Sequence, residues 1–187
     1  MSETDLIRRA RQGDGAAWEA LVQAHQQAVF RLAYLFLGDA DQAEDVAQEA
    51  FIRAYHALDR FDVTRPLRPW LLSITANLAR NQRRSAGRYL AAVRRAFQDS
   101  PSAAIDIEAS AVQNWEAQSL WQAVRRLSFE DQRVIYFRYF IDLSVDETAA
   151  ALGVAEGTVK SRLHRALKRL REVIDREYPS LKEGRLQ

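Results

Sequence analysis

Apolar residues recur three or four positions apart along almost the whole chain, whereas no convincing segment alternates with a period of two. This spacing places apolar side chains on one face of a helix, so the pattern predicts an all-α fold. In the first half we expect one helix to carry the apolar stripe of residues 18–36, a second to cover residues 42–58, and a third to begin at Trp70. Pro66 and Pro69 mark the break before the third helix.

The chain divides near its middle, where residues 98–110 are rich in Ala, Ser and Asp and lack a long apolar stripe. A segment of this composition is typical of a linker. We therefore predict two helical domains, over residues 1–95 and 114–187, joined by an acidic linker over residues 96–113. With 187 residues, of which 48% are hydrophobic, the chain has enough apolar material for both domains.

The second predicted domain contains the most specific local pattern of the chain. Ser144 and Glu147 have the spacing of a capping box, in which the hydroxyl and the carboxylate each bind a free backbone N–H at a helix start. Gly153 ends this short helix, and a second helix starts near Glu156. The two helices predict a helix-turn-helix, whose second helix enters the major groove of DNA. The residues expected on the buried side of the second helix are Val159, Leu163, Ala166, Leu167, Leu170 and Val173.

The opposite face of that second helix is rich in side chains that can donate hydrogen bonds to phosphates and base edges. A solvated basic helix on a helical bundle is the alternative interpretation. The capped helix and the glycine turn that precede it favour DNA binding. The candidate DNA-binding residues are Thr158, Lys160, Ser161, Arg162, His164, Arg165 and Lys168.

The formal net charge is only +2, but the charges are unevenly distributed. An acidic block over residues 39–49 is followed by a basic block over residues 80–95. A stretch with acidic residues and no lysine or arginine, residues 96–124, then separates this block from a second basic block over residues 160–171. Two basic segments with an acidic spacer between them indicate one polyanion contacted at two places.

The acidic block falls on the second predicted helix. Helical spacing places its polar side chains on one face, opposite the stripe of Val46, Ala50 and Ala54. A compact acidic face suits a basic protein partner and would repel DNA. An ordinary solvated helix face is one alternative, and magnesium binding by the carboxylates at 44, 45 and 49 is another. The candidate protein-binding residues are Asp41, Glu44, Asp45, Gln48 and Glu49.

A third candidate site combines aromatic, amide and arginine side chains on and just before the third predicted helix. Aromatic side chains stack on exposed bases and arginines hold the backbone of an unpaired strand, while an amide can read a flipped base. The alternative is that the two aromatic residues belong to the core. The candidate residues are Phe61, Trp70, Asn77, Arg80, Arg83 and Arg84.

The chain has no cysteine, which excludes disulfides, a thiol nucleophile, and thiolate ligands for zinc or an iron–sulfur cluster. Its three histidines are too dispersed to indicate a metal site, and no phosphate loop or catalytic triad is assembled. We therefore expect no cofactor and no enzymatic activity. The N-terminus lacks the layout of a secretory signal, and the apolar runs are too short to span a membrane. These features predict a cytoplasmic protein without membrane insertion.

Three ordered motifs resemble those of the extracytoplasmic-function (ECF) sigma factors, the smallest class of bacterial sigma subunits. The first, within residues 38–51, is similar to the region that docks on the clamp helices of the polymerase largest subunit. The second, within residues 61–84, is similar to the segment that melts and reads the minus-ten element. The third, within residues 127–163, is similar to the domain that reads the minus-thirty-five element and contacts the polymerase flap.

The resemblance implies a sigma factor that binds core RNA polymerase, recognises both promoter elements in DNA and assists promoter melting. It implies that Asn77 lies near a captured minus-ten base, that Phe61 and Trp70 shape the melting region, and that an anti-sigma factor is a partner. One departure is Ala155, which stands where Ser often caps the recognition helix. The loss of such a cap typically costs about 1 kcal/mol.

A stand-alone helix-turn-helix transcriptional regulator is the alternative function. Such a protein binds duplex DNA without polymerase, usually as a dimer on a palindrome. The sequence has no obvious extra dimerisation helix or ligand-sensing domain.

Overall fold

The computed structural model describes residues 2–96, 115–179 and 181 of the chain. Every regular element in this part is helical, which confirms the predicted all-α fold. The predicted linker lies, apart from Ala96, outside the described residues. The elements are α1 (Glu3–Arg11), α2 (Gly15–Leu37), α3 (Ala40–Ala57), the 3₁₀ turn η1 (Leu58–Arg60), α4 (Leu67–Ala96), α5 (Trp115–Arg125), α6 (Phe129–Ile135), the π-helix η2 (Tyr136–Phe140), α7 (Val145–Leu152) and α8 (Glu156–Glu177).

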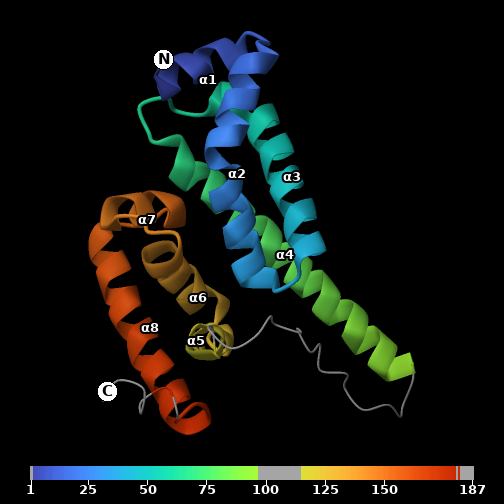
Figure 1. Ribbon diagram of the computed structural model, residues 1–187, viewed down its shortest axis with the longest axis vertical. Coiled ribbons are helices and arrows are strands. Elements are labelled where there is room, and N and C mark those ends of the chain that lie inside the picture. The colour runs from blue at the N-terminus through green and yellow to red at the C-terminus, as the bar shows by residue number, and fades with distance from the viewer. Residues whose placement is uncertain (1, 97–114, 180, 182–187) are drawn as a thin grey trace.

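The first four helices form one bundle, called here the N-terminal bundle. In it α2, α3 and α4 pack against one another, and α1 lies across the beginning of α2 (Figure 1). Helix α1 was absent from the sequence prediction because it is short and mostly polar. A capping box between Ser2 and Asp5 starts it, and burial of Ile7 and Ala10 holds it on the bundle.

Helices α5 to α8, with η2, form the C-terminal bundle. Helix α8 packs on α5, α6 and α7 and lies on the outer side, away from the N-terminal bundle (Figure 1). The side chain of Gln132 is fully buried inside this bundle. Its amide nitrogen donates hydrogen bonds to the carbonyl oxygens of Arg125 at 3.1 Å and Leu127 at 2.8 Å. These bonds tie the end of α5 to α6.

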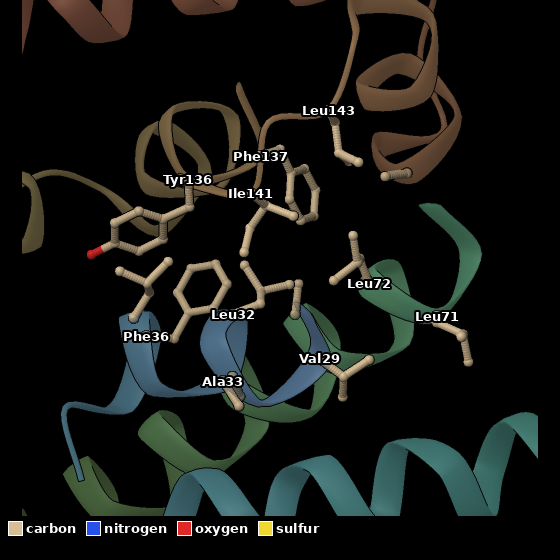
Figure 2. Packing of buried hydrophobic residues seen from close by; sticks show 14 of the residues in the cluster. Val29, Leu32, Ala33, Phe36, Leu71, Leu72, Tyr136, Phe137, Ile141 and Leu143 are labelled. Atoms are coloured by element: carbon tan, nitrogen blue, oxygen red, sulfur yellow. The ribbon is translucent and has the colours of Figure 1, made fainter. Parts of the chain in front are cut away.

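The two bundles share a continuous apolar core, called here the bundle interface. Figure 2 shows Leu32 and Phe36 of α2 and Leu72 of α4 facing side chains of the C-terminal bundle, whereas Val29 and Ala33 point into the N-terminal bundle. Each fully buried large apolar side chain contributes roughly 1.5–3 kcal/mol. On the side of the C-terminal bundle, the interface consists of Phe129, Tyr136, Phe137, Ile141 and Leu143.

Polar and aromatic contacts surround this apolar interface. The indole N–H of Trp121 donates to the carbonyl oxygen of Leu35 at 3.1 Å, and its ring stacks on Tyr34 with the centroids 5.9 Å apart. The Arg68 guanidinium donates to the carbonyl oxygen of Ile141 at 2.7 Å. These contacts fix how the C-terminal bundle sits on α2 and α4.

Candidate protein and nucleic-acid interfaces

The helix-turn-helix is present as predicted. The backbone N–H of Ser144 donates to the Glu147 carboxylate at 2.8 Å, and the N–H of Glu147 donates to the Ser144 hydroxyl at 3.2 Å. Gly153 ends α7 in the left-handed conformation, with φ of 66°. Helix α8 starts at Glu156, and Ala155 supplies no side-chain cap. The sequence therefore located both helix boundaries of the motif.

The candidate residues of α8 lie together along its outward side, called here the α8 face. Lys160, Ser161, His164, Arg165 and Lys168 are exposed, while Thr158 and Arg162 are partly buried. The buried side consists of Val159, Ala166, Leu170 and Val173, with Leu163 half-buried. The expectation that Leu167 is buried was wrong, because it lies at the edge of the apolar stripe and keeps 36% of its surface exposed.

Arg169, in the second half of α8, forms an ion pair with another helix of the C-terminal bundle. The guanidinium Nη1 of Arg169 donates to both carboxylate oxygens of Asp131, at 2.9 and 2.8 Å. The Asp131 side chain is nearly buried, so this pair fixes α8 on the start of α6. The arginines of α8 therefore include some on the exposed face of the helix and one, Arg169, that binds another helix of the same bundle.

The five candidate protein-binding residues lie on one side of α3, called here the acidic face. Four are exposed and Glu49 is half-buried. The Glu49 carboxylate accepts a hydrogen bond of 2.6 Å from Arg53, and the Gln48 amide donates to Glu44 at 3.4 Å. The opposite side of α3 buries Ala43, Val46, Ala47, Ala50 and Ala54. Packing on α2 and α4 therefore turns the acidic face toward solvent.

The same side of α3 becomes apolar toward its C-terminal end, which the sequence analysis did not single out. Ile52 and Tyr55 are 52% and 43% exposed, and they line a surface hollow with Trp18, Phe51 and His56. Ile52 follows Asp45 by seven residues, which is two helical turns, so both side chains lie on one face. This spacing is the sequence signal that could have revealed the apolar extension.

The residues of the third candidate site, on and just before α4, differ in their burial and in their contacts. Phe61 is buried and packs against the half-buried Trp70 with ring centroids 4.7 Å apart, so Phe61 belongs to the core, as its alternative interpretation stated. Asn77 and Arg84 are exposed on α4. They differ by seven positions and therefore share one face of the helix.

Arg80 and Arg83 are engaged by the C-terminal bundle. Arg80 forms an ion pair of 3.3 Å with Glu130, and Arg83 donates to the side-chain oxygen of Gln132 at 2.7 Å. Both guanidiniums lie over the ring of Phe129, at 5.4 and 5.9 Å from its centroid. Burial and the neighbouring charge of Arg125 lower the pKa of Arg83. The sequence did not predict these contacts, because they join segments about fifty residues apart.

The described residues contain no cluster of three or more side chains suited to hold a metal ion, and the carboxylates of α3 form none. The magnesium alternative for the acidic block therefore has no structural support. Within the same part of the chain, no helix is both long and apolar enough to cross a bilayer.

Two family descriptions match the chain in the order of the two bundles. Sigma-70 region 2 matches residues 21–89, and Sigma-70, region 4 matches residues 117–170. The fold and its interfaces therefore define a two-region protein of the sigma-70 class. The matched segments fall inside the two predicted domains, whose outer boundaries stay predictions.

Two relatives of known family identify the family of this chain within the sigma-70 class. The ECF RNA polymerase sigma factor SigW of Bacillus subtilis (strain 168) is 32% identical over 174 residues, covering 89% of this chain and 93% of SigW. SigL of Mycobacterium tuberculosis is 37% identical over 167 residues, covering 88% and 93%. The chain belongs to the ECF RNA polymerase sigma factors. It is a promoter-recognising sigma factor, and a stand-alone regulator is not favoured.

Solved structures agree with this assignment. CnrH, in complex with the cytosolic domain of CnrY, matches with a TM-score of 0.69 and 28% identity over 94% of this chain and 98% of CnrH. RpoE of Bartonella quintana, in complex with the anti-sigma factor NepR, matches with a TM-score of 0.63 and 26% identity over 85% of this chain and 97% of RpoE. The similarity therefore includes both bundles.

Proposed function

We propose that this sigma factor docks on core RNA polymerase through α3 and contacts promoter DNA through two separate helices, α4 and α8. The observation that carries the proposal is the separation of three exposed faces with different chemistry. The acidic face belongs to α3, an amide and arginine face to α4, and a cationic face to α8. One polypeptide can then bind a basic protein and two segments of DNA at once.

The docking partner for α3 is the pair of clamp helices of the polymerase largest subunit. Carboxylates at the start of the helix select a basic surface and accelerate the encounter. Ile52 and Tyr55 add an apolar anchor at the other end of the same face, where Trp18 and Phe51 line the hollow. An apolar core beside charged groups is the usual composition of a protein interface.

On α4, Asn77 and Arg84 are proposed to contact the minus-ten element. An amide can read the hydrogen-bonding edge of a flipped base, and an arginine can hold the phosphates of the unpaired strand. Unstacking costs a few kcal/mol per base, and capture of the flipped base offsets this cost. Melting therefore requires binding energy and no catalytic group, and we propose that the chain is not an enzyme.

On α8, the exposed cationic residues are proposed to contact the minus-thirty-five element. The second helix of a helix-turn-helix enters the major groove, and this supports the assignment of α8. Lys160 and Arg165 can bind phosphates, while Ser161 and Arg162 can reach base edges. The same bundle is proposed to contact the polymerase flap.

The proposal includes an anti-sigma factor and a cytoplasmic location with polymerase. It is supported by the structure of RpoE, which contains the anti-sigma factor NepR, and by that of CnrH, which contains the cytosolic domain of CnrY. The acidic linker over residues 96–113 is proposed to follow a basic channel of polymerase between the two DNA-binding regions.

Run-off transcription tests the proposal. Core polymerase is assayed with and without the protein on a pool of promoter fragments from the same genome. Specific transcripts that require the chain are expected. If core polymerase neither binds the protein nor gains specificity, while the protein alone shifts duplex DNA, the chain acts as a stand-alone regulator instead.

A further inference from the structure

A buried hydroxyl without a partner lies at the edge of the bundle interface. The side chain of Tyr136 is fully buried, and its hydroxyl has no hydrogen-bond partner within the described residues. Figure 2 shows the ring of Tyr136 beside Phe36 and the hydroxyl oxygen pointing away from the apolar cluster. Buried polar groups are nearly always hydrogen-bonded, so the position of this hydroxyl indicates a partner from outside the chain.

The groups around the Tyr136 hydroxyl are hydrogen-bond donors. Arg125 and Arg83 lie close enough for their charges to act on the phenol, and the indole N–H of Trp121 is also near it. That N–H already donates to the carbonyl oxygen of Leu35 at 3.1 Å. Burial raises the pKa of Tyr136, so the phenol stays neutral and its O–H remains a donor. The missing partner must therefore be an acceptor.

The two arginines share this need for an acceptor. Nη1 of Arg83 donates to the side-chain oxygen of Gln132 at 2.7 Å. Nη2 of Arg125 donates to the carbonyl oxygen of Leu37 at 3.4 Å, and its guanidinium lies 4.9 Å from the ring centroid of Trp121. Each guanidinium has more N–H donors than these contacts use.

The positive charges of the two arginines are also uncompensated by acidic side chains. Within the described part of the chain, neither Arg83 nor Arg125 forms an ion pair with a carboxylate. Burial and the neighbouring charge of Arg125 lower the pKa of Arg83, which shows that the two charges act on each other. A negative charge between them would relieve this repulsion.

We infer that a small inorganic anion, phosphate or chloride, binds between Arg83, Arg125 and the hydroxyl of Tyr136. One anion can accept hydrogen bonds from the hydroxyl and from both guanidiniums, and such charge-assisted bonds are the strong ones. The three residues belong to α4, α5 and η2, so the anion cross-links the N-terminal bundle and the C-terminal bundle. The inference is independent of the proposed roles with polymerase and DNA.

Burial limits the size of the ligand. The Tyr136 side chain is fully buried, whereas Arg83 and Arg125 are half-buried. The ligand therefore reaches the site from the side of the arginines, and a bulky organic anion does not fit beside the hydroxyl. A water molecule could accept from the hydroxyl, but it would leave the two positive charges uncompensated.

The first measurement is the melting temperature of the full chain at constant ionic strength. Sodium gluconate, whose anion is bulky, is replaced stepwise by sodium chloride or by sodium phosphate. A saturable rise is expected, of about 3–6 °C at about ten times the Kd. The anion whose curve saturates at the lower concentration is the preferred ligand. Equal melting temperatures in all three salts, or a rise that never saturates, would overturn the inference.

Three variants locate the response. Tyr136→Phe removes only the hydroxyl, so the melting temperature in gluconate should not fall, while the anion affinity should fall about ten- to hundredfold. Arg125→Gln should abolish the saturable rise. Arg126→Gln is the matched control, because the Arg126 side chain is 65% exposed and pairs with Glu177. A full response in both Tyr136→Phe and Arg125→Gln would place the anion elsewhere and would overturn the site.

A crystal structure of the unaltered chain tests the site directly. Crystals are grown in sodium bromide, whose anion replaces chloride and scatters anomalously, and separately in sodium phosphate. A bromide peak or a tetrahedral phosphate density is expected within hydrogen-bonding distance of the Tyr136 hydroxyl and both guanidiniums. A water molecule at this position in both crystals, or anions bound only at other positions, would refute the assignment.

Discussion

The faces of α4 and α8 contain the same kinds of side chain, but they differ in how far other helices of the protein engage them. On α8, Lys160, His164 and Arg165 are exposed. The helix lies on the outer side of the C-terminal bundle (Figure 1). On α4, the cationic side meets α6, and Arg80 and Arg83 are held by it. The availability of an arginine for DNA therefore depends on what lies opposite it.

The comparison also concerns how much of each face other helices cover. The α8 face is exposed, whereas α6 covers Arg83 on α4 and leaves Asn77 and Arg84 exposed.

The largest expected effect tests whether α3 is a protein-binding face distinct from both DNA faces. Asp45→Lys together with Glu49→Lys should abolish binding to core polymerase, because the reversed charges would repel a basic partner. Both residues lie on the solvent side of α3, so the fold should persist. Affinity is measured by fluorescence anisotropy with labelled protein. Glu19→Lys on α2 is the control for a charge reversal outside the acidic face, and unchanged affinity of the double variant would refute the docking assignment.

The next effect concerns the bundle interface, where α2 and α4 pack against the C-terminal bundle. Phe36 is fully buried and its ring lies 4.7 Å from Phe129 and 5.1 Å from Tyr136. Phe36→Ala should lower the free energy of unfolding by about 3–5 kcal/mol. Urea denaturation followed by circular dichroism measures this change. Phe30→Ala is the control, since Phe30 is 39% exposed, and an equal loss there would argue against a shared core.

A smaller effect distinguishes the exposed α8 face from the ion pair that Arg169 of the same helix forms with Asp131. Lys160→Ala should weaken holoenzyme binding to all minus-thirty-five sequences by a similar factor and reduce the slope of log affinity against log salt by about one, because one phosphate contact is lost. Arg169→Ala should instead lower the free energy of unfolding by about 1–3 kcal/mol, since it leaves the nearly buried carboxylate of Asp131 without its hydrogen-bond donor. Filter binding at several salt concentrations separates the two, and equal salt slopes would contradict the distinction.

The smallest effect concerns the start of α8. Ala155 provides no side-chain cap, whereas Ser144 caps α7. Ala155→Ser should therefore raise the free energy of unfolding by about 1 kcal/mol, and Ser144→Ala should lower it by about the same amount. Thermal unfolding measures both changes. A lower melting temperature for Ala155→Ser would show that the start of α8 is held by other means.

The sequence predicted those parts of the fold that depend on nearby residues. The capping box at Ser144 and the turn at Gly153 act over three or four positions, and both boundaries of the helix-turn-helix followed from them. The polar sides of α3 and α8 were also predicted, because helical periodicity shows which side chains share a face.

Periodicity does not show what a buried side faces, and the bundle interface could not be predicted for this reason. The stripe on α2 serves two partners at once, with Val29 turned into its own bundle and Phe36 toward Tyr136 (Figure 2). The engagement of Arg83 by Gln132 is likewise set by tertiary packing. An arginine that looks free in the sequence was therefore assigned to DNA alone.

The turn between α2 and α3 lies where the C-terminal bundle packs on the N-terminal bundle. Gly38 has φ of 74°, and a Cβ atom there would lie 2.5 Å from Nη1 of Arg125 and 3.2 Å from the ring of Trp121. At Gly13, with φ of 85°, a Cβ atom would meet nothing within 4 Å. A side chain at either turn would strain the backbone, but only at Gly38 would it also displace the Arg125 guanidinium and crowd the Trp121 ring. The space left by the missing methyl group lets Trp121 and Arg125 of the C-terminal bundle pack on this turn, next to α3, the helix that is proposed to dock on polymerase.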